Sequence, residues 1–197
     1  MNLAMSAKAV PLFEAVKAFI QNEIDPITAE YFRLGEGRPD RWQYGKGQLE
    51  LLNSVKAKAK AQGLWNFFLP NAETGEGLSN LDYAYIANEL GKNPLASECL
   101  NCSAPDTGNM EVLERVGTPE QKKRWLEPLL AGEIRSAYAM TEPDVASSDA
   151  KNLECRAVKD GDEWLINGEK FYISGAGDPR CKIMICMLRT SQDGPPH

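Results

Sequence analysis

The chain has 197 residues, of which 43% are hydrophobic and 25% charged, and its formal net charge is −6. This balance is typical of a soluble protein with a sizeable core, and an acidic chain without a Lys/Arg run gives no sign of nucleic-acid binding. No apolar run approaches the ~20 residues of a membrane span, and Met1 to Val10 lacks a secretory signal, so we expect a cytoplasmic location, with a mitochondrial or peroxisomal one left open.

The chain up to about residue 133 has the apolar spacing of helices. The first helix is expected to start at Pro11 and to end before Pro26. The second is expected from Gly47 to Ala61, with Gly63 closing it. Three lysines of this second helix are expected to face mostly solvent: Lys56, Lys58 and Lys60.

Further helices follow before residue 133. Ser79 is typical of an N-cap, and shorter helical stretches are indicated within Pro94–Cys102 and Pro105–Val116. The clearest helix start is Thr118-Pro119-Glu120-Gln121, where Thr118 caps and Gln121 can reach back, as in a capping box. Pro128 is expected to bend or end that helix.

After residue 133 the apolar residues alternate or cluster as they do in strands. Asp160-Gly161 and Asn167-Gly168 are dipeptides typical of tight turns. Strands are expected at residues 136–141, 153–159, 163–166, 170–174 and 182–188. Five short strands leave an open edge that needs cover, so we expect further chain or a partner to complete the sheet.

These elements predict an α+β multidomain protein. Residues 1–133 are expected to form an N-terminal all-α helical bundle. Residues 134–197 are expected to form the first part of an antiparallel β-barrel-like domain.

Several familiar site patterns are incomplete. No glycine pair has both the third glycine and the strand–turn–helix setting of a dinucleotide fingerprint, and no P-loop is present. Cys99 and Cys102 form a C-x-x-C, but a zinc site needs a second ligand pair, and the only histidine is His197. The odd, scattered set of five cysteines does not indicate a disulfide framework. We therefore expect thiols that are partly buried and no metal site.

Two stretches carry the strongest signal. The first contains Gly117-Thr-Pro-Glu-Gln-Lys122, then Gly132-Glu-Ile134 and Thr141-Glu-Pro143, with Ser148-Asp149 after it. The second, residues 164–174, reads Trp-Leu-Ile-Asn-Gly-Glu-Lys-Phe-Tyr-Ile-Ser, and Glu89-Leu-Gly91 is a weaker third match. In this order, over roughly residues 10 to 190, the chain resembles the acyl-CoA dehydrogenase family, whose members have G-T-x-E-Q-K, G-E-I, T-E-P and W-x-x-N-G-x-K-x-W-I-T at the corresponding places.

The resemblance implies an FAD-dependent flavoprotein oxidoreductase of fatty acid metabolism that dehydrogenates acyl-CoA thioesters between Cα and Cβ, and a homo-oligomer. A flavin has polar edges that need backbone groups and a hydroxyl, and a flat face that takes an aromatic side chain. The residues that the resemblance places at the FAD are Tyr138, Ala139, Met140, Thr141, Ser147, Ser148, Tyr172, Ile173 and Ser174. Ser148 also matches the serine between the cofactor and the CoA portion of the substrate.

The chain departs from the family pattern in two places. Five residues separate Pro143 from Asp149 where the family form T-E-P-G-A-G-S-D has four, so either Ser147 or Ser148 can be the serine that meets the cofactor. Tyr172 and Ser174 stand where the family has Trp and Thr. Read singly, Thr141 could simply end a strand, Tyr172 could be a half-buried strand aromatic, and Glu142-Pro143 could be an ordinary turn.

The family's catalytic glutamate base lies in a second helical bundle that follows the β domain, and no acidic residue here matches its motif. We therefore assign no catalytic residue and expect the chain alone to be inactive. Two alternatives stay open: a non-catalytic truncated homologue that acts as a binding or assembly partner, and a relative similar to flavin monooxygenases or nitroalkane oxidase.

Overall fold

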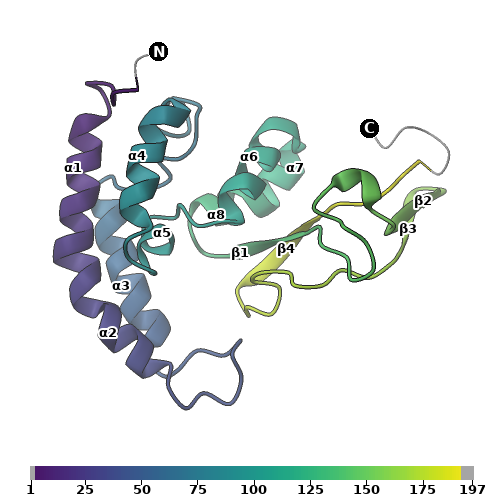
Figure 1. Ribbon diagram of the computed structural model, residues 1–197, viewed down its shortest axis with the longest axis horizontal. Coiled ribbons are helices and arrows are strands. Elements are labelled where there is room, and N and C mark those ends of the chain that lie inside the picture. Colours follow the sequence, from purple (N-terminus) through teal and green to yellow (C-terminus); the bar gives the residue numbers. More distant parts are fainter. Residues whose placement is uncertain (1–2, 192–197) are drawn as a thin grey trace. The chain divides into compact units, whose positions relative to one another are not determined.

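The computed structural model describes residues 3–191. They form two compact units, one ending at Glu111 and the other beginning at Val112, and helix α6 (Asp106–Val116) spans the boundary. The other helices of the first unit are α1 (Val10–Phe19), the π-helical turn η1 (Ile20–Ile24), α2 (Asp25–Leu34), α3 (Gln48–Ala61), α4 (Asn80–Leu90) and α5 (Ala96–Cys99) (Figure 1). Within residues 3–191 no helix is both long and apolar enough to cross a bilayer.

Proline does not end the first helix, and the expected stop before Pro26 is wrong. The chain stays helical through Leu34, and in Figure 1 α1, η1 and α2 form one continuous coil. The amide of Asp25 donates to the carbonyl of Ile20, five residues back. This wider turn sets Pro26 in the first turn of α2, where proline's missing N–H is tolerated. The same arrangement recurs at Pro128, where the π-helical turn η2 (Lys122–Leu126) precedes α8 (Glu127–Leu130).

The first unit is held by apolar side chains between its helices. Helix α1 packs on α4, α2 on α3, and α3 on α5. The largest side chains of this unit that are fully buried include Val16, Ile24, Leu52, Phe67 and Ile86.

The expectation that three lysines of α3 face solvent is wrong for Lys56. Its side chain is only 6% exposed, and its Nζ lies 2.9 Å from Oε1 of Glu98 on α5. Helix α5 covers this face of α3 and supplies the carboxylate that a buried ammonium needs. Lys58, by contrast, has a side chain 54% exposed, as expected.

The predicted helix caps are present. The Ser79 hydroxyl oxygen accepts from the amide of Asp82 at 3.1 Å. Thr118 and Gln121 form both bonds of the capping box, at 2.9 and 3.3 Å. Gly63 follows α3 with a φ of +71°, the left-handed conformation that favours glycine.

In its described part, residues 112–191, the second unit contains short helices and four strands. Its remaining elements are α7 (Pro119–Gln121), the 3₁₀ turn η3 (Ala150–Asn152), β1 (Arg135–Ala139), β2 (Arg156–Asp160), β3 (Glu163–Asn167) and β4 (Cys181–Cys186). β1 pairs with β4 in parallel, and β2 pairs with β3 as an antiparallel hairpin. A helical region followed by a partial sheet confirms the predicted fold class.

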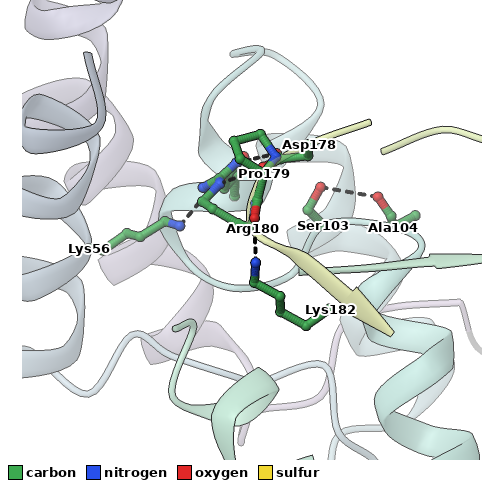
Figure 2. A network of polar contacts seen from close by, with 8 residues as sticks. Lys56, Ser103, Ala104, Asp178, Pro179, Arg180 and Lys182 are labelled. Carbon is green, nitrogen blue, oxygen red and sulfur yellow. Dashed lines mark hydrogen bonds and ion pairs between the residues drawn. The ribbon is translucent and has the colours of Figure 1, made fainter. Parts of the chain in front are cut away.

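The described strands form two separate two-stranded sheets rather than the single sheet of five strands that was predicted, and two further details differ. Residues 170–174 are not a strand, since Tyr172 has a φ of +55°, which no extended strand accommodates. The first and last strands are parallel rather than antiparallel, because the segment from Met140 to Arg180 carries the chain back to the starting end of the sheet. There Arg180 binds Asp178 through Nε at 3.1 Å and Nη2 at 2.8 Å, and the Lys182 ammonium donates to the Pro179 carbonyl (Figure 2).

The two predicted turn dipeptides have different outcomes. In the first, Asp160 still pairs with Glu163 in the ladder, and Gly161, with a φ of +58°, supplies the turn. The second is not a hairpin turn. Gly168 has a φ of +144°, and a Cβ added there would lie 2.6 Å from Sγ of Cys155. This glycine therefore lets the segment after β3 pass closely against the residue that precedes β2.

Candidate functional site

The end of β1 lies beside the segment that follows β3. The carbonyl of Met140 accepts from Nζ of Lys170 at 3.0 Å. The next carbonyl, that of Thr141, accepts from the amide of Phe171, also at 3.0 Å. Two stretches about 30 residues apart in sequence are thereby joined, and they are the two that carry the family motifs.

Glu142 is the polar centre of this junction. Its side chain is 4% exposed, and Oε1 lies 2.7 Å from the Lys170 ammonium. The same carboxylate accepts from the amides of Glu154 at 2.7 Å and Cys155 at 3.0 Å. Burial by itself would raise the pKa of Glu142, but Lys170 and the two amides outweigh burial and hold the pKa below its usual value.

Tyr172 presents its ring to solvent. The residue is 83% exposed, and its ring centroid lies 4.2 Å from that of Phe171 with the two planes tilted by 55°. A φ of +55° is unfavourable for a residue with a bulky side chain, and such strain concentrates at functional sites. The alternative of a half-buried strand aromatic does not describe this residue, because it is neither half-buried nor in a strand.

Thr141 keeps its donors available. It is exposed, and only its carbonyl is used, in the bond from Phe171. Among residues 3–191, neither its amide nor its hydroxyl has a hydrogen-bond partner. In the described part of the chain, Thr141 thus has an N–H and an O–H without partners, just after β1 and bonded through its carbonyl to the residue before Tyr172.

The other predicted residues divide into exposed and buried positions. Tyr138 is 36% exposed, whereas Ala139 is buried and its carbonyl accepts from the amide of Met187 at 3.0 Å. Met140 and Ile173 are partly buried, and Ser174 is exposed.

The two candidate serines have different environments. Ser147 is 3% exposed, and its hydroxyl oxygen accepts from the amide of Glu142 at 2.8 Å. Ser148 is exposed. The hydroxyl of Ser147 therefore supports the loop, and the hydroxyl of Ser148 is the accessible one.

Sequence reasoning missed the roles of Glu142 and Lys170. Both lie within the quoted motifs, Glu142 in Thr-Glu-Pro and Lys170 in Asn-Gly-Glu-Lys. The available signal was that two motifs expected at one site carry opposite charges, which could have indicated an ion pair. The reading of Glu142-Pro143 as an ordinary turn overlooked the buried carboxylate.

Next to Glu142 is a cavity of about 200 Å³ that Asp144, Glu154 and Glu169 also line. In the described part of the chain, no cluster of His, Cys, Asp and Glu is arranged to hold a metal ion.

None of the five cysteines, all of which lie in the described part of the chain, forms a disulfide. Cys99 and Cys102 are buried rather than partly buried as expected. Burial raises the pKa of the Cys99 thiol to about 12 and raises that of Cys102 as well. These two thiols are therefore core residues of the first unit.

Comparison with known proteins assigns the chain to a family. Residues 8–133 match the N-terminal domain of acyl-CoA dehydrogenases, and residues 137–197 match the middle domain. Among curated relatives, the probable acyl-CoA dehydrogenase FadE2 of Mycobacterium tuberculosis is 46% identical over 200 aligned positions, which cover 100% of this chain and 47% of the relative. Acyl-CoA dehydrogenase family member 11 of Gallus gallus is 49% identical over 188 positions, covering 94% of this chain and 23% of the relative.

Solved structures agree with this assignment. A provisionally assigned acyl-CoA dehydrogenase from Mycobacterium abscessus has a TM-score of 0.86 and 48% identity, covering 97% of this chain and 48% of that protein. PigA, solved as an FAD complex, shares the fold, with a TM-score of 0.69 at 23% identity over 98% of this chain and 46% of that protein. The chain therefore spans about half or less of the length of these relatives. With its two domain matches, its motifs and its fold in agreement, the chain belongs to the acyl-CoA dehydrogenase family.

Proposed function

We propose that this chain forms one wall of the flavin and acyl sites of an FAD-dependent acyl-CoA dehydrogenase. The observation that carries the proposal is the bond from the Phe171 amide to the Thr141 carbonyl, at 3.0 Å. It places the exposed ring of Tyr172 on a segment adjoining Thr141, whose amide and hydroxyl have no hydrogen-bond partner among the described residues.

These residues fit a flavin. The polar edge of the flavin ring has nitrogen and oxygen acceptors, which the amide and hydroxyl of Thr141 suit as donors. The flat face of the ring can lie against an aromatic side chain, and Tyr172 is exposed enough to provide one. The partly exposed Tyr138 and the exposed Ser174 extend the same wall.

The residues of the wall would bind and orient the cofactor. FAD, when bound, supplies an acceptor for the hydride that leaves the substrate β-carbon. Ser148, which is exposed, is the serine we assign between the cofactor and the CoA portion of an acyl-CoA substrate. No residue of this chain is assigned as the base that removes the α-proton, so dehydrogenation is proposed for the intact enzyme, and we expect such an enzyme to be a homo-oligomer.

Titration of the purified chain with FAD tests the proposal, read by quenching of flavin fluorescence and by induced visible circular dichroism. We expect saturable binding that weakens in Thr141→Val, which keeps the side-chain shape and removes the hydroxyl donor, and in Tyr172→Ala. Trp164→Ala is the matched control, since Trp164 is also an exposed aromatic of the second unit, 53% exposed, but lies on the β2–β3 hairpin. Absence of flavin binding, or equal loss in all three variants, would refute the proposed wall.

A further inference from the structure

Three separate segments meet at the carboxylate of Glu142. Glu142 itself follows the end of β1, Glu154 and Cys155 precede β2, and Lys170 follows β3. The carboxylate accepts from both amides of the second segment and from the ammonium of the third, at 2.7 to 3.0 Å. This small group of bonds therefore fixes the mutual position of the three segments.

The pair directly flanks the proposed flavin contacts. Glu142 is the residue after Thr141, and Lys170 is two residues before Tyr172. Lys170 also donates to the carbonyl of Met140 at 3.0 Å, so it is bonded on both sides of Thr141. Any change in the distance between Glu142 and Lys170 must therefore be absorbed by the backbone that carries Thr141 and Tyr172.

Burial prevents solvent from substituting for either partner of the Glu142–Lys170 contact. The side chains of Glu142 and Lys170 are 4% and 11% exposed, so water cannot replace either partner without opening the junction. The carboxylate has two amide donors as well as the ammonium, an arrangement that favours its charged form. The left-handed backbone of Tyr172 also needs support, because a strained conformation persists only where its surroundings determine it.

We propose that Glu142 and Lys170 are a positioning pair that sets the spacing between Thr141 and Tyr172, and hence the geometry of the flavin wall. This inference rests on the proposed function for its consequence, flavin binding. Its structural part, the link from the pair to the Phe171–Thr141 bond, stands independently and can be measured without flavin.

The variants are chosen to separate positioning from general stability. Lys170→Met removes the ammonium and keeps an unbranched side chain. The double variant Glu142→Gln/Lys170→Met removes both charges, so no lone charge is left buried, and it decides the outcome if the single variant does not fold. The control is Asp178→Asn, which weakens the Asp178–Arg180 pair of the same unit, whose side chains are 15% and 18% exposed (Figure 2). That pair adjoins the first residues of β1 and β4, at the opposite end of the strands from Glu142.

The first measurement is hydrogen exchange at the Phe171 amide in the flavin-free chain, followed by NMR. In the pair variants we expect exchange at least roughly tenfold faster than in the native chain, while amides within β1 keep their protection. In Asp178→Asn the Phe171 amide should exchange within about threefold of the native rate. Unchanged Phe171 protection in the folded double variant would overturn the inference.

The second measurement is FAD affinity with the visible circular dichroism of the bound flavin, which reports the surroundings of the ring. We expect the pair variants to bind at least roughly tenfold more weakly with an altered spectrum, and Asp178→Asn to match the native spectrum. Native affinity and spectrum in the pair variants would overturn the positioning role and leave the flavin wall intact. A native chain that binds no FAD would instead count against the proposed function, and the exchange rates alone would then decide whether the pair positions the segment.

Discussion

Gly168 offers a sharp test of how the second unit is packed. Replacing it with Ala would place a Cβ 2.6 Å from Sγ and 2.7 Å from Cα of Cys155, distances that require something to move. The backbone of Cys155 is held on both sides: its amide donates to Glu142 at 3.0 Å, and its carbonyl accepts from the amide of Arg189 at 2.8 Å. We therefore expect the clash to be relieved only by displacing the segment around residue 168.

The magnitude has two parts. A φ of +144° suits only glycine, and forcing another residue there costs about 1–3 kcal/mol. Crowding of a well-packed site costs about 1–3 kcal/mol more. Gly161→Ala is the control, since its φ of +58° lies in the left-handed region that other residues adopt at some cost, and no atom lies within 4 Å of the added Cβ, so it carries a backbone cost and no packing cost.

The assay is equilibrium unfolding in urea. The free energies of unfolding of the two variants are compared when their dependences on urea concentration have equal slopes. We expect Gly168→Ala to be less stable than Gly161→Ala by at least about 1–3 kcal/mol, the packing cost, because its backbone cost is also the larger of the two. Equal losses for the two variants would refute the close approach of residue 168 to Cys155.

Three more predictions test other features of the fold. Glu98→Gln should destabilise the chain by about 3 kcal/mol because it removes the carboxylate charge that lies 2.9 Å from the buried Lys56 ammonium. Glu23→Gln, which weakens an exposed pair with Lys58, should cost under about 0.5 kcal/mol in the same urea assay. Similar costs for the two variants would contradict the burial of Lys56. Because the pKa of Glu142 is lowered on folding, its contribution to stability is complete above the unfolded-state pKa and is lost as pH falls through the folded-state value. In acid, the free energy of unfolding of Glu142→Gln should therefore fall less steeply with pH than that of the native chain. An unchanged pH profile would rule out a charged Glu142. Gly108→Ala, within α6 and with open space around the added Cβ, should raise the free energy of unfolding by about 0.5–1 kcal/mol, and a loss would mean that the position is not a regular helix.

Features set by neighbouring residues could be predicted from the sequence. The capping box of Thr118 and Gln121 and the cap at Ser79 depend on residues three apart, and both are present. The two motifs were also sufficient to identify the family, because short patterns in a fixed order do not require knowledge of the packing.

Features set by distant residues could not be predicted. The solvent exposure of Lys56 depends on α5, more than 35 residues later, which covers it with Glu98. The parallel pairing of β1 with β4 depends on the path of the 41 residues from Met140 to Arg180. The left-handed backbone of Tyr172 has no local signal, since tyrosine does not favour that conformation. The rule that proline ends a helix fails at Pro26, because a π-helical turn precedes it.

The most direct test of the flavin wall is to map which backbone amides of the isotope-labelled chain shift when FAD is added. The account predicts that the shifts concentrate at residues 138–141, at Ser148 and at residues 172–174, with little change along the β2–β3 hairpin. Shifts that centre on the hairpin or on the first unit, with Thr141 and Tyr172 unaffected, would contradict it.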